Sequence, residues 1–71
     1  MKNSTKTFDV VFNDDIDSNC KGFEQDAADC YTWIQNNKNS DINFKDYATG
    51  TVTIVCNESG ETIQEIDIAT L

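Results

Sequence analysis

The side chains that could do chemistry in this sequence are mostly carboxylates. The 71 residues include 13 Asp and Glu against five lysines, with no arginine and no histidine, which gives a formal charge of −8 at pH 7. Without histidine, Ser-His and Cys-His nucleophilic pairs cannot form and the commonest zinc ligand is missing. Direct nucleic-acid binding is disfavoured because phosphates are neutralised by clustered Lys and Arg. We therefore expect no enzyme, and a basic protein is a more plausible partner than DNA or RNA.

One acidic run has a spacing that suits a hard cation. Asp15, Asp17 and Asn19 alternate like the first three ligands of a calcium loop, and Asp26 stands at the closing position. Cys20 occupies the place where the sharp turn needs glycine, and Asp reaches less far than the usual bidentate Glu. Weak calcium binding is kept as an alternative function, and no metal or other cofactor is predicted.

The three cysteines fit neither a disulfide framework nor a zinc site. Cys20, Cys30 and Cys56 are an odd number, and no two of them are closely paired. Cys30 and Cys56 fall on expected core faces, where a free thiol behaves as a small apolar group. We expect Cys20 to be the least buried of the three.

A β-hairpin is the clearest structural signal in the chain. Two runs rich in Val, Ile and Thr predict strands at 50–57 and 61–68, joined by a three-residue loop with Gly60 in the left-handed region. The expected register places Val52 opposite Ile66, Ile54 opposite Gln64, and Val55 opposite Ile63. The hairpin, GTVTIVCNESGETIQE, resembles those of small bacterial and phage proteins, and no function follows from this likeness.

Alternation predicts a further strand at 6–13, and a stripe with helical period predicts a helix at 22–37. The fold class is α+β: one small βαββ domain spanning 1–71, with a three-stranded sheet and one helix packed on one face. We favour an antiparallel sheet in the order 1-3-2, with strand 61–68 in the middle, over the order 1-2-3. The expected core is Phe8, Val10, Phe12, Phe23, Ala27, Cys30, Ile34, Val52, Ile54, Cys56, Ile66 and Ile68.

Two surface clusters follow from the direction of the predicted strands. If the helix carries the chain back, the first two strands run in the same direction. Seven acids then gather at one pole: Asp14, Asp15, Asp17, Glu24, Asp26, Glu58 and Glu61. Three apolar side chains then point away from the helix on the open face of the sheet: Val11, Val55 and Ile63. The candidate partner-binding residues are Val11, Val55, Ile63, Asp14, Asp15, Asp17, Glu58 and Glu61.

These features favour a small regulatory module that binds protein, either another chain or a weak homodimer, through its open sheet face or a sheet edge. The alternative is an acidic inhibitor that imitates nucleic acid and occupies the basic groove of a nucleic-acid-handling enzyme. No apolar run is long enough for a membrane span, and the N-terminus lacks the apolar core of a signal peptide, so we expect a cytoplasmic protein.

Overall fold

The structure is a computed structural model that describes residues 6–71. Within these residues the chain forms four strands, two α-helices and a short 3-10 helix. Their bounds are β1 (Phe8–Asn13), β2 (Ser18–Cys20), α1 (Ala27–Asn37), α2 (Ile42–Asp46), β3 (Thr51–Cys56), β4 (Thr62–Asp67) and η1 (Ile68–Thr70). No helix in this part of the chain is long and apolar enough to cross a membrane.

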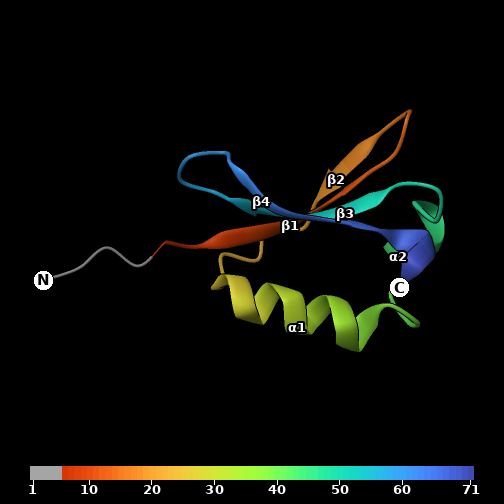
Figure 1. Cartoon of the computed structure of the whole chain (residues 1–71), viewed down its shortest axis with the longest axis horizontal. Helices are drawn as coiled ribbons and strands as arrows, with labels where there is room; N and C mark the ends of the chain where they lie inside the picture. Colours follow the sequence, from red (N-terminus) through yellow and green to blue (C-terminus); the bar gives the residue numbers. More distant parts are fainter. Residues whose placement is uncertain (1–5) are drawn as a thin grey trace, which may run out of the picture.

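The strands form one antiparallel sheet in the order β2-β1-β3-β4. Figure 1 shows α1 lying along one side of this sheet, with α2 and the C-terminus at one end. The α+β class, the antiparallel sheet and the single main helix are confirmed. The three-stranded sheet and the order 1-3-2 are wrong, because β2 is a fourth strand and β3, not β4, lies beside β1.

A tight turn between β1 and β2 explains both errors. Asp14 Oδ1 accepts hydrogen bonds from the backbone N–H groups of Ile16 at 2.9 Å and Asp17 at 2.8 Å, which closes an Asx-type turn. The chain then returns along β1, so that Gln25 bridges Phe8 at the start of that strand. Helix α1 therefore begins at this end, and β3 runs antiparallel to β1 instead of parallel.

Helix α1 begins at Ala27, five residues later than the predicted helix at 22–37. The preceding segment stays extended beside β1, where Lys21 N donates to Val10 O at 2.8 Å. Glu24 has a φ of 54°, which no α-helix accommodates. The Asp26 side chain caps the helix by accepting from the backbone N–H of Asp29 at 2.8 Å.

The β3–β4 hairpin keeps the predicted register over most of its length. Ile54 pairs with Gln64, and Val52 with Ile66, as expected. Beyond Ile54 a β-bulge shifts the register, so that Val55 lies opposite Thr62 and not Ile63. Gly60 has the predicted positive φ, at 77°. The loop is longer by one residue, since Cys56 N donates to Glu61 O at 2.8 Å.

The core lies between the sheet and the two helices. The residue Gly50 lets β3 start close to the end of β1, since a Cβ there would lie 1.8 Å from the backbone oxygen of Asn13. Helix α2 and its C-cap residue add two rings that the predicted core lacks. The centroids of the Phe44 and Tyr47 rings lie 4.9 Å and 6.0 Å from that of Phe12. The buried apolar residues are Val10, Phe12, Cys30, Ile34, Phe44, Tyr47, Val52, Ile54, Cys56 and Ile68. Four other predicted core residues are only partly buried around them: Phe8, Phe23, Ala27 and Ile66.

Truncation of Ile54 should test this packing. Its side chain is 1% exposed at the centre of the core, so Ile54→Ala should lower the free energy of unfolding by about 2–5 kcal/mol. Ile42→Ala is the matched control, because Ile42 is 65% exposed and should change stability by less than about 0.5 kcal/mol. Urea denaturation of both variants measures the difference, and equal effects would contradict the described core.

Candidate functional site

The acidic residues that were expected at one pole lie at two opposite ends of the sheet. Phe8 pairs with Cys56 and Asn13 pairs with Thr51, so the β1–β2 turn and the β3–β4 turn are a full strand apart. The first turn carries Asp14, Asp15 and Asp17, and the second carries Glu58 and Glu61. Glu24 and Asp26 lie with the second group, because Gln25 bridges to Phe8. The single acidic pole is therefore wrong, and the reversal of direction in β2 is the reason.

The expected calcium ligands are separated in the same way. Asp17 Oδ1 accepts from the backbone N–H of Ser18 at 2.8 Å in the β1–β2 turn, whereas Asp26 caps α1 at the other end. Among the described residues, no group of three or more Cys, Asp or Glu side chains is arranged to hold a metal ion.

The predicted apolar set is brought together only in part. Val11 and Val55 are both half-buried. They lie on the face of the sheet opposite α1, because each alternates along its strand with residues of the core. Val11 lies opposite Thr53, two residues from Val55, so the two valines are diagonal neighbours on that face. Ile63 is 47% exposed and is the extra residue of the β4 bulge.

Among residues 6–71, no strand pairs with the outer side of β4, which is therefore a free sheet edge. Ile68 N donates to Gly50 O at 3.1 Å, and hydrogen-bonded pairs alternate along an antiparallel ladder. Counting back from this pair, the backbone N–H and C=O groups of Glu65 and Asp67 point away from β3. These side chains lie opposite Thr53 and Thr51, on the face that α1 does not cover.

The opposite edge of the sheet, formed by β2, is less available for pairing with a strand of another protein. Strand β2 has only three residues, and its Asn19 side chain donates to Asn43 Oδ1 of α2 at 3.0 Å. Asn43 in turn donates to Asp41 Oδ1 at 2.9 Å, and Asp41 forms an ion pair with Lys21 at 3.7 Å. This polar chain ties α2 to the β2 edge.

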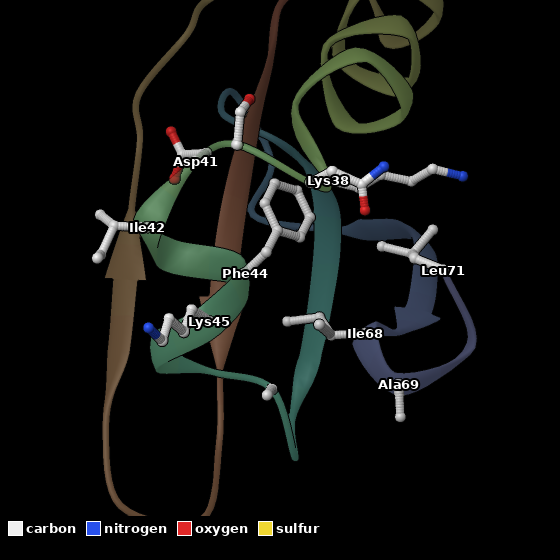
Figure 2. A pocket seen from close by; sticks show the side chains of 11 residues that line it. Lys38, Asp41, Ile42, Phe44, Lys45, Ile68, Ala69 and Leu71 are labelled. Carbon is white, nitrogen blue, oxygen red and sulfur yellow. The ribbon is translucent and has the colours of Figure 1, made fainter.

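A cavity of about 420 Å³ opens between α2 and the C-terminal segment. Its apolar lining includes Phe44, Ile68 and Leu71 (Figure 2). Lys38 and Lys45 also line it, and Figure 2 shows them on opposite sides of Phe44 with their ammonium groups directed outward. We call this cavity the α2 pocket. Sequence reasoning missed it because α2 was not predicted.

A second cavity, of about 310 Å³, lies beside α1. Phe23 and Trp33 line it, with ring centroids 4.7 Å apart in an edge-to-face arrangement. Lys21 Nζ lies 5.6 Å from the centre of the Trp33 ring, so a lysine of the chain itself already contacts the indole.

Ile16 is an exposed apolar residue that sequence reasoning also missed. It is 93% exposed, more than any other large apolar side chain among the described residues. It stands between Asp15 and Asp17 at the β1–β2 turn. The signal was present in the sequence as an isoleucine surrounded by turn-forming acids.

The thiols are free, with Cys30 and Cys56 buried and Cys20 exposed, as predicted. Burial raises the pKa of the Cys30 thiol, and the nearby Asp9 carboxylate adds to the effect. Burial likewise raises the pKa of Tyr47, whose hydroxyl donates to Asp17 Oδ2 at 3.4 Å. The Cys56 pKa is lowered instead, because the hydroxyl and the backbone N–H of Ser59 favour its thiolate form.

Comparison of the chain with known protein families, with curated proteins and with solved structures finds no match. The β4 edge, the α2 pocket and the exposed β1–β2 turn are the surface features that bear on function.

The lowered pKa of Cys56 predicts how the stability of the protein depends on pH. A lowered folded pKa contributes stability as pH rises through it, and the contribution is complete above the ordinary value of 9.0. Ser59→Ala should raise the Cys56 pKa, so thiolate absorbance should appear at higher pH and this gain in stability should shrink. Cys30 acts in the opposite sense, because its raised pKa contributes stability below 9.0 that is lost at higher pH.

Ultraviolet titration of the thiolates in a Cys20→Ser background measures the change. Ser40→Ala serves as the matched control, because Ser40 is an exposed serine far from Cys56 in the chain. Identical titration curves for Ser59→Ala and the control would contradict this role of Ser59.

Proposed function

We propose that this protein binds another protein by accepting one of its strands at the free edge of β4, and that the added strand is basic. The observation that carries the proposal is the place of β4 at the end of the sheet order. Five of its six residues are exposed, and Ile66 is half-buried. An uncovered edge strand is a template for strand addition, in which main-chain hydrogen bonds supply affinity.

Charge complementarity supports the choice of a basic partner. Glu65 and Asp67 offer the outward backbone groups of β4, and their carboxylates lie on the open face beside an added strand. Opposite charges directly across neighbouring strands stabilise pairing, and like charges destabilise it. A strand with Lys or Arg at alternate positions can therefore make backbone and side-chain contacts together.

The open face beside β4 supports the same proposal. Val11 and Val55 are half-buried there. A partner that reaches across the sheet could therefore place apolar side chains in contact with these two valines. The module would work without catalysis, as an accessory or regulatory protein.

A peptide of alternating lysine and valine residues can test the β4 edge. In isotope-labelled protein, this peptide should slow hydrogen exchange at the Glu65 and Asp67 amides and shift their resonances, because these N–H groups become paired. The double variant Glu65→Lys/Asp67→Lys should weaken binding at least about tenfold by removing the charge match.

The control is Asp15→Lys/Glu58→Lys, which makes the same change in net charge away from the β4 edge. It should retain binding within about threefold if the contact is local, since distant exposed charges are largely screened at physiological salt. Equal losses in the two double variants, or no change in exchange at Glu65 and Asp67, would overturn the proposal.

A further inference from the structure

The β1–β2 turn and the α2 pocket have complementary chemistry. The turn presents one exposed isoleucine, Ile16, between two aspartates. The pocket presents an apolar floor that includes Phe44 and Ile68, with lysines on either side. An apolar side chain flanked by acids thus matches an apolar cavity flanked by ammonium groups.

From this match we propose that two copies of the chain associate by placing Ile16 of each copy in the α2 pocket of the other. The occupant of the pocket is a second copy of the chain. The Asp15 carboxylate of that copy lies beside Lys45, and the part of its turn that carries Asp17 lies next to Lys38. This contact is separate from the β4 edge, so either can fail without the other.

Both features lie at the same end of the molecule, which permits a reciprocal exchange. Tyr47, at the end of α2, donates to Asp17 Oδ2 at 3.4 Å, and Figure 1 shows the turn and α2 on the same side. Two copies related by a two-fold axis can therefore each give a turn and receive one, as in other isologous dimers. The high exposure of Ile16 means that the turn does not enter the pocket of its own chain.

The lysine ammonium groups at the rim of the pocket are available for this contact. The ion pair among the described residues joins Lys21 to Asp41, and Lys38 Nζ donates weakly to Gln35 Oε1 at 3.4 Å. Lys45 has no carboxylate partner within residues 6–71. Asp41 also lines the pocket, but its charge is balanced by Lys21.

The association should be weak, because a single anchor side chain is buried in each direction and each copy carries a charge of −8. A dissociation constant on the order of 1 mM changes the dimer fraction between about 0.05 and 1 mM protein. Over this range, the resonances of Ile16, Ile68 and Leu71 should shift together in wild type. The variant Ile16→Ser should abolish the shifts, whereas Ile63→Ser, which also removes an exposed isoleucine, should keep them.

A charge exchange makes the test specific. The variants Asp15→Lys and Lys45→Glu should each associate less than wild type, because each places like charges at the contact. A mixture of the two should associate at least about threefold more tightly than either alone, since both contacts in the mixed dimer are then complementary.

If repulsion between the net charges of the two copies alone controlled association, the affinities of the same samples would rank differently. Asp15→Lys would then self-associate most tightly, because it carries the smallest net charge of the samples. Three results would each overturn the proposed dimer. The resonances could be independent of concentration in wild type, or their shifts could persist in Ile16→Ser. The mixture could also associate no better than Asp15→Lys alone.

Discussion

The hydrogen bonds that Asp14 makes to the backbone of its own turn determine the direction of everything that follows. Its carboxylate holds the N–H groups of Ile16 and Asp17, and its own N–H donates to Asp17 O at 3.0 Å. This turn sends the chain back along β1 before the helix begins. Because α1 then starts beside Phe8 and runs along the sheet, β3 begins opposite Asn13, at the far end of β1 (Figure 1). Strand order and the separation of the acidic groups both follow.

The parts of the fold with a periodic pattern were predictable from the sequence. The alternation in β1 and β3 and the helical stripe around Cys30 and Ile34 place most of the buried residues correctly. Strand β2 was not predictable by this route, because all three of its residues are exposed and polar or small. Helix α2 has five residues, too few for a helical period to appear, and its Asn43 packs as a buried polar residue with its hydrogen bonds made.

The start of α1 illustrates how tertiary contacts override local preference. Phe23 fits the apolar stripe of a longer helix, but its neighbours exchange backbone hydrogen bonds with β1 instead. Phe23 still reaches the core edge, where its ring meets Trp33 at 4.7 Å. The residues of the candidate site were also hard to predict, because the sequence does not reveal which strands are neighbours in the sheet. The acids of the turns were correctly identified as surface groups, whereas the edge position of Glu65 and Asp67 depends on the strand order.

The two proposed contacts differ in the partner that their charges permit. If two β4 edges paired with each other, Glu65 and Asp67 of one copy would lie beside the same residues of the other, and four carboxylates would repel across the new ladder. The bulge at Ile63 disturbs such pairing further, because it interrupts the regular spacing of the edge. The turn and the α2 pocket lack this conflict, since acids on one copy meet lysines on the other. Self-association through the α2 end would therefore leave the β4 edge free for a basic strand from a different protein.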